Sequence, residues 1–224
     1  MLLRKCLTEF VGTFFLVLTI CLFVEGNRTD MPSMLAPLAI GSVLMVMVYM
    51  GGHISGAHYN PAVSVAVLLR GKLPLKDFVP YVVSQLIGAM CASLLAYAIV
   101  GNTVVLAPAP WVSPGKAVLV EFIFSFALAL VVLNVATSEG TKGNSFYGLA
   151  IGFTVLVGAV AAGGISGGAF NPAVGIGPTF VHAMLGKGSM THLWIYIVGP
   201  VFGAILATVV FTFQNGTKLT IDKS

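Results

Sequence analysis

Two nearly identical polar phrases stand out in an otherwise apolar chain. Residues 54–63 read ISGAHYNPAV and residues 165–174 read ISGGAFNPAV, so the two copies begin 111 residues apart. Both end in Asn-Pro-Ala-Val, an order typical of a helix start, because the Asn side chain can cap the first turn and Pro needs no partner at the first helical position. We therefore predict short helices over about 60–69 and 171–181, each opened by its asparagine.

The chemistry that these phrases offer is hydrogen bonding. A helix N-terminus carries about half a positive charge, so two such ends that meet beside Asn60 and Asn171 would accept solute oxygens and repel cations. The motif residues are Asn60, Pro61, Ala62, Asn171, Pro172 and Ala173. Six residues before the asparagines are expected in extended geometry with carbonyl groups aimed into a lumen: Gly56, Ala57, His58, Gly167, Gly168 and Ala169.

The rest of the chain has the composition of an integral membrane protein. Hydrophobic residues make up 58% of it and charged residues 8%, and the mean hydropathy is +1.01, far from the values of a soluble globular chain. Apolar stretches of roughly 20 residues, the length that crosses a bilayer as a helix, lie at about 6–24, 34–50, 78–100, 117–137, 146–164 and 193–213. We therefore predict an all-α membrane protein with six transmembrane helices.

The two polar phrases also mark an internal repeat. Each phrase follows a span and starts an apolar run that is too short to cross the bilayer alone. A span glutamate precedes the asparagine by 51 residues in the first copy and by 50 in the second. We predict two repeats, 1–108 and 109–224, each with three spans and a re-entrant half-helix, which together form one pore domain. Because three is odd, the second repeat is inverted, and the half-helices enter from opposite faces.

Those glutamates, Glu9 and Glu121, are the only acidic residues inside the predicted spans. A charge there costs roughly 2.5–3.5 kcal/mol even on the lenient insertion scale. One interpretation makes them proton relays. The alternative, which their matching spacing favours, is that each supports a loop by accepting backbone N–H bonds from the residues that precede a half-helix.

The cationic residues indicate the orientation of the chain. Eight of them are predicted on the cytoplasmic side and three outside: Arg4, Lys5, Arg70, Lys72, Lys76, Lys142, Lys218 and Lys223, against Arg28, Lys116 and Lys187. This excess predicts a multi-pass protein of the cell membrane with both termini cytoplasmic. Because the cations lie singly or in small groups beside spans, we expect a lipid bilayer and no nucleic acid as partner.

At this point the chain resembles the aquaporin family, the major intrinsic proteins, over essentially its whole length. The resemblance rests on the paired Asn-Pro-Ala, the phrase GHISGAHYNPAV at 52–63, the two span glutamates and SQLIGA after the first half-helix. It implies a homotetramer with one pore per subunit, passive conduction of water and small neutral solutes, and proton exclusion at the two asparagines. The six residues with lumenal carbonyls would form the carbonyl ladder of the family.

One position departs from the family pattern. Family members usually carry arginine after the second Asn-Pro-Ala, where it lines the outer filter, but this chain has Val174. By spacing from the asparagines, the other filter positions fall at Ile40, Ala159 and Gly168. Such an aliphatic ring predicts a wider, less polar filter, and it resembles the arsenical-associated branch of bacterial aquaporins. Neutral metalloid hydroxides such as arsenite are therefore candidate solutes, and a broad glycerol, urea or ammonia channel is the alternative.

Two other classes of protein are less favoured. An ion-coupled secondary transporter also uses inverted repeats and broken helices, but coupling needs an ion site or a titratable group near the substrate, and the predicted pore positions offer none. The four histidines, His53, His58, His182 and His192, show no ligand pairing or partnered nucleophile. We therefore predict no catalytic residue, no metal and no cofactor, and we expect the ring of His58 to serve packing.

Overall fold

The structure is a computed structural model that describes residues 1–26, 35–186 and 188–222. Over these ranges it is helical and contains no strand. The long helices are α1 (Leu2–Gly26), α2 (Ala36–Ser55), α4 (Leu75–Val100), α5 (Pro114–Thr137), α6 (Tyr147–Ser166) and α8 (Ile195–Gln214). The short ones are α3 (Pro61–Leu69), α7 (Pro172–Met184) and the 3₁₀ turn η2 (Glu139–Thr141). Arg28, Lys187 and Lys223, which were used to predict orientation, lie outside the described residues.

The long helices correspond to the six predicted spans. All six are long and apolar enough to cross a membrane, and α3 and α7 begin at the prolines of the two phrases. The expected fold class, with six spans and two half-helices, is confirmed. Two helix ends were placed too early. α2 continues past residue 50 until Gly56 adopts a φ of 88°, and α7 continues past residue 181 to Met184.

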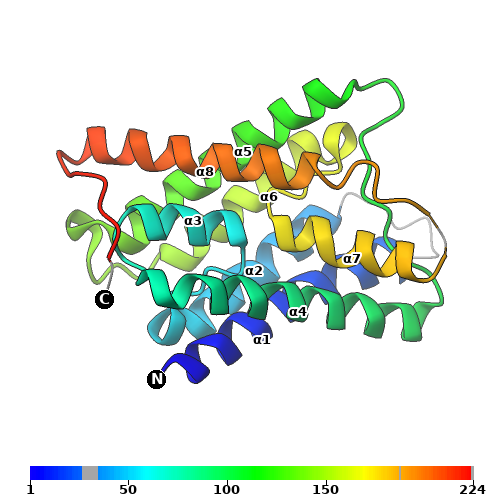
Figure 1. Cartoon of the computed structure of the whole chain (residues 1–224), viewed down its shortest axis with the longest axis horizontal. Coiled ribbons are helices and arrows are strands. Elements are labelled where there is room, and N and C mark those ends of the chain that lie inside the picture. The colour runs from blue at the N-terminus through cyan, green and yellow to red at the C-terminus, as the bar shows by residue number, and fades with distance from the viewer. Residues whose placement is uncertain (27–34, 187, 223–224) are drawn as a thin grey trace.

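The helices pack in two equivalent sets. α1 packs against α4, α5 packs against α8, and α2 packs against α6 between the sets. Each half-helix contacts the last span of the other set, α3 with α8 and α7 with α4. Figure 1 shows α3 and α7 in opposite halves of the molecule, while α1 begins and α8 ends at the same end. The packing follows the inverted arrangement, and the boundary between residues 108 and 109 stays a prediction.

Close packing of the spans depends on glycine at two equivalent crossings. A Cβ on Gly88 of α4 would stand 2.6 Å from Phe10 O of α1, and a Cβ on Gly203 of α8 would come still closer to Phe122 O of α5. In both cases the obstacle is backbone, which cannot rotate away as a side chain can. These two glycines therefore set the distance between the first and last spans of each set.

Replacing Gly88 by alanine should destabilise the folded protein. The added methyl group forces α1 away from α4, and overpacking of this kind costs about 1–3 kcal/mol. Gly115→Ala is the matched control, because a Cβ at Gly115 meets nothing within 4 Å. Thermal unfolding in detergent, followed by circular dichroism, should give a lower midpoint for Gly88→Ala alone. Equal midpoints for the two variants would contradict this account of the crossing.

Candidate functional site

A buried carboxylate holds the loop before the first half-helix. Glu9 Oε1 accepts hydrogen bonds from Ser55 Oγ at 2.6 Å and from the His58 N–H at 3.0 Å. Glu9 Oε2 accepts from the Tyr59 N–H at 2.7 Å and from Gln85 Nε2 at 2.8 Å. Hydrogen bonds to a charged group contribute about 1.5–3 kcal/mol each. Four of them outweigh an insertion cost of roughly 2.5–3.5 kcal/mol, so the loop and the carboxylate stabilise each other.

Glu121 makes the same contacts in the second half of the chain. Its Oε1 accepts from Ser166 Oγ at 2.7 Å and from the Ala169 N–H at 3.0 Å, and its Oε2 accepts from the Phe170 N–H at 2.7 Å. Both glutamates are fully buried, and neither lines the cavities described below. These contacts support the loop-holding interpretation over the proton relay.

The loops themselves are tightly turned. Our expectation of extended geometry is wrong for four of the six carbonyl-bearing residues, which have left-handed φ angles: Gly56 at 88°, Ala57 at 51°, Gly167 at 98° and Gly168 at 65°. The chain has to reverse between the end of a span and the start of a half-helix, and left-handed residues make that reversal in few steps. The last carbonyl group of each preceding span accepts a hydrogen bond from a tyrosine hydroxyl. Tyr81 donates to Ser55 O at 2.7 Å, and Tyr196 donates to Ser166 O at 2.6 Å.

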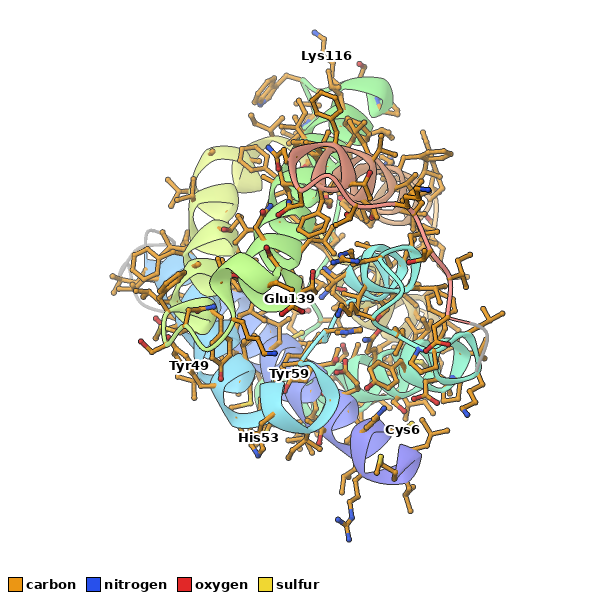
Figure 2. All side chains as sticks on the ribbon, turned by 90° about the vertical axis from the view of Figure 1, so that its left-hand side faces the viewer. Cys6, Tyr49, His53, Tyr59, Lys116 and Glu139 are labelled. Carbon is orange, nitrogen blue, oxygen red and sulfur yellow. The ribbon has the colours of Figure 1, made fainter. Side chains whose placement is uncertain are left out.

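The residues directly before the asparagines were not singled out from the sequence. Tyr59 and Phe170 both have a φ of 50°, an uncommon conformation for a bulky residue. It persists because a glutamate oxygen binds each N–H, as described above. Figure 2, viewed from the end at which α1 begins, shows Tyr59 toward the middle of the bundle and Lys116 at its edge. The sequence signal was an aromatic residue before Asn in both copies.

Each asparagine caps its own half-helix. Asn60 Oδ1 accepts from the Ala62 N–H at 2.8 Å, and Asn171 Oδ1 accepts from the Ala173 N–H at 2.9 Å. Both asparagine side chains line a cavity. The other four motif residues, Pro61, Ala62, Pro172 and Ala173, are buried and lie behind that lining.

The same two side chains join the halves of the protein. Asn60 Nδ2 donates to Phe170 O at 2.9 Å, and Asn171 Nδ2 donates to Tyr59 O at 2.9 Å. Each carbonyl acceptor therefore belongs to the opposite loop. A side-chain amide has two N–H groups, so these bonds engage one N–H of each asparagine. Two half-helix N-termini, with their partial positive charge, meet at this point.

One cavity of about 760 Å³ opens beside the loop between α4 and α5, and we call it the outer cavity. All four predicted filter positions line it: Ile40, Ala159, Gly168 and Val174. Of the predicted carbonyl residues, Ala57, His58, Gly167, Gly168 and Ala169 line it and Gly56 does not. No Asp, Glu, Lys or Arg is found among the described residues of its wall, whose polar side chains are His58, Tyr59, Asn60 and Asn171. The structure thus gathers the predicted positions into one largely aliphatic space.

A second cavity of about 630 Å³, the inner cavity, lies at the end where α1 begins. Its wall includes three lysines and one acidic residue: Lys5, Lys72, Lys142 and Glu139. In the described part of the chain, three residues line both cavities: His58, Val132 and Ile151. The ring of His58 therefore lies at the junction, which the expected packing role did not anticipate. Within that same part of the chain, no cluster of three His, Cys, Asp or Glu side chains is arranged to hold a metal.

Comparison with known proteins places this pore in a family. The sequence model described as "Major intrinsic protein" matches residues 1–211. The chain is 40% identical over 207 residues to aquaporin NIP1-3 of Oryza sativa subsp. japonica, covering 90% of this chain and 70% of that protein. It is 38% identical over 227 residues to nodulin-26 of Glycine max, covering 99% and 82% of the two chains.

A solved structure, the aquaglyceroporin from Plasmodium falciparum, shares the fold. The TM-score is 0.83 with 23% sequence identity, over 94% of this chain and 96% of that one. The chain therefore has two inverted half-helices between six apolar spans, and the family model matches it over residues 1–211. The chain belongs to the major intrinsic protein family, whose aquaporins are passive membrane channels for water and small solutes and not enzymes.

Proposed function

We propose that this channel conducts water and small uncharged solutes through a wide outer filter that lacks a fixed cation. The observation that carries the proposal is the presence of Val174 in the outer cavity together with Ile40, Ala159 and Gly168. Their side chains offer neither a hydrogen-bond donor nor a charge. Larger neutral solutes therefore avoid the bulk of an arginine, and polyols lose the donors that would select them. Neutral metalloid hydroxides such as arsenite are candidate solutes, and a broad glycerol, urea or ammonia channel is the alternative.

The centre of the pore supports passive exclusion of cations. Both half-helix N-termini and the free N–H groups of Asn60 and Asn171 direct positive potential at a solute there. The proposed carbonyl ladder supplies acceptors on the other side of the solute. At the asparagine pair itself, Na⁺ and K⁺ would face N–H donors and the positive ends of two helices, which disfavours their passage there. A coupled transporter would need an ion site, and the outer cavity wall offers no charged side chain among the described residues.

A swelling assay on proteoliposomes tests the proposal. Vesicles exposed to gradients of water, glycerol, urea and arsenite, with no ion gradient, should show protein-dependent flux of water and arsenite at neutral pH. Flux of glycerol and urea without arsenite would favour the broad channel. Flux only in the presence of an ion gradient would favour a coupled carrier and reject the channel proposal.

The assembly and orientation are part of the same proposal. We propose a homotetramer in the cell membrane with one pore per subunit and both termini cytoplasmic. In support, α1 begins and α8 ends at the same end of the molecule (Figure 1), and the wall of the inner cavity carries Lys5, Lys72 and Lys142 against one acidic residue, Glu139. Native mass spectrometry in detergent tests the stoichiometry, and protease access to a tag in right-side-out vesicles tests the orientation.

Val174→Arg should narrow the solute range. A guanidinium adds bulk, a fixed charge and up to five donors to the ring formed with Ile40, Ala159 and Gly168. We expect the permeability of glycerol and arsenite, relative to water, to fall at least tenfold, which corresponds to about 1.4 kcal/mol of added barrier. Val174→Leu adds bulk without charge and is the control. An unchanged solute-to-water ratio in folded Val174→Arg would place the filter elsewhere.

Asn171→Asp should open the centre to cations. The carboxylate cannot donate to Tyr59 O, and its negative charge is stabilised by two helix N-termini, so it attracts Na⁺ and K⁺ to the middle of the pore. Planar bilayers should show a cation current for this variant and none for the unsubstituted protein. Asn134→Asp makes the same chemical change outside both cavities and should carry no cation current. If Asn171→Asp carries no cation current and its solute flux is unaltered, the proposed exclusion of cations at the asparagine pair is wrong.

A further inference from the structure

The aromatic ring that precedes the first asparagine lies in a pocket between α1 and α2. Tyr59 has an exposed fraction of 0%. A Cβ on Gly12 of α1 would overlap the Tyr59 ring, and a Cβ on Gly51 of α2 would overlap the Tyr59 hydroxyl. The ring therefore fits between these two helices because both carry glycine where it lies.

Hydrogen bonds hold Tyr59 at both ends. Its backbone N–H donates to Glu9 Oε2 of α1 at 2.7 Å, and its hydroxyl donates to Met47 O of α2 at 2.9 Å. Each of the two helices thus contributes one acceptor and one glycine. We call the surroundings of the ring, formed by Gly12, Met47 and Gly51, the tyrosine pocket.

The tyrosine pocket holds an uncommon backbone conformation. Tyr59 has a φ of 50°, and a residue other than glycine held in this region costs of order 1–3 kcal/mol. The direction of the Tyr59 carbonyl group depends on this conformation. If the ring left its pocket, the backbone could relax to a more favourable φ and the carbonyl oxygen would turn away from its present partner.

That partner is the asparagine of the other half. Tyr59 O accepts a hydrogen bond from Asn171 Nδ2 at 2.9 Å. Within the described part of the chain, α7 and its cap contribute Asn171 and Val174 to the wall of the outer cavity. Of these two side chains only Asn171 carries a hydrogen-bond donor, so its orientation matters more in a pore whose filter position is a valine.

We propose that Tyr59 is a positioning residue for the pore, and that it acts through Asn171. The tyrosine pocket fixes the ring, the ring fixes the direction of the Tyr59 carbonyl group, and that carbonyl group orients the Asn171 amide. The packing of α1 against α2 is thereby coupled to a donor on the opposite half of the protein. The inference rests on the proposed exclusion of cations at the asparagine pair.

Comparison of the two halves shows that a re-entrant loop can be built without this pocket. At the positions equivalent to Gly12 and Met47, the second half has Phe124 and Gly158. The Phe170 ring packs against Phe124, with ring centroids 5.4 Å apart, and a Cβ on Gly158 would stand 2.8 Å from Phe170 Cε2. Phe170 has no hydroxyl to anchor its ring. The anchored ring therefore belongs to the first half of the protein.

The test uses Gly12→Ala, Tyr59→Leu and the double variant of the whole chain. The methyl group of Gly12→Ala displaces the ring, and Tyr59→Leu removes both the ring and its hydroxyl. Each should weaken the Asn171 bond, so Na⁺ flux relative to water flux in proteoliposomes should rise roughly three- to tenfold, the effect of one hydrogen bond. In the double variant Gly12→Ala should add nothing to the effect of Tyr59→Leu, since no ring is left to displace.

The spectrum of the side-chain amides gives a second readout that does not depend on flux. In protein labelled with ¹⁵N-asparagine, the signals absent from Asn171→Asp identify Asn171. The proton signal of its hydrogen-bonded N–H should move upfield in Gly12→Ala and in Tyr59→Leu, because the hydrogen bond to Tyr59 O is weakened.

Two alanine variants serve as matched controls. Gly203→Ala meets backbone of α5 in the other half of the protein, so it should lower the thermal stability and leave the Asn171 signals unchanged. Gly115→Ala meets nothing within 4 Å and should change neither. A shift of the Asn171 signals in Gly203→Ala equal to that in Gly12→Ala would mean that general loss of packing is the cause, and would overturn the proposal.

The remaining outcomes also decide the question. Unchanged Asn171 signals in folded Gly12→Ala and Tyr59→Leu overturn the proposal, as do additive effects in the double variant. If Gly12→Ala does not fold, the spectrum of Tyr59→Leu decides. Shifted Asn171 signals without Na⁺ flux support the positioning role and contradict the proposed exclusion of cations, so the two failures are distinguishable.

Discussion

An N–H group buried in the middle of a bilayer needs a hydrogen-bond acceptor from the protein, and the buried polar residues around the two half-helices supply it. Each half-helix begins at mid-depth, so the loop before it brings unpaired backbone with it. Glu9 and Glu121 meet that need by accepting the loop N–H groups. Burying either a carboxylate or an unpaired loop alone would be unfavourable. The hydrogen bonds between them compensate the desolvation free energy of both.

This mutual dependence also explains which features the two halves share and which they do not. The glutamate, the serine at the end of the span and the tyrosine that satisfies that end recur in both halves, because both loops face the same hydrogen-bonding requirement. Gln85 and Ser64 have no counterpart of similar chemistry, since Pro200 and Gly175 stand at their positions. The features that recur in both halves are therefore those that a re-entrant loop requires.

Much of the fold follows from sequence because its signals are local. A span is recognised by its length and composition, and a half-helix by Asn-Pro followed by a short apolar run, so all eight helices were placed within a few residues. The pairing of Glu9 and Glu121 with the loops followed from equal spacing in a repeat. These inferences need no knowledge of the packing around them.

The details of the site depend on contacts from distant residues, and they could not be predicted in the same way. Nothing in the local sequence requires Tyr59 to be left-handed; its N–H is bound by the Glu9 carboxylate, 50 positions earlier in the chain. The orientation of the His58 ring depends on Ser64 and Gln85, and Gln85 lies on a different helix. The filter positions were inferred from family spacing, and their shared cavity is a property of the packed bundle.

The reciprocal bonds between the two asparagines and the opposite loops have a mechanical consequence. Asn60 donates to Phe170 O and Asn171 donates to Tyr59 O, so neither half-helix tip can withdraw without breaking a hydrogen bond to the other half of the protein. These two bonds hold the tips of α3 and α7 together at mid-membrane. Any movement that changed the width of the pore at this depth would have to break at least one of these hydrogen bonds.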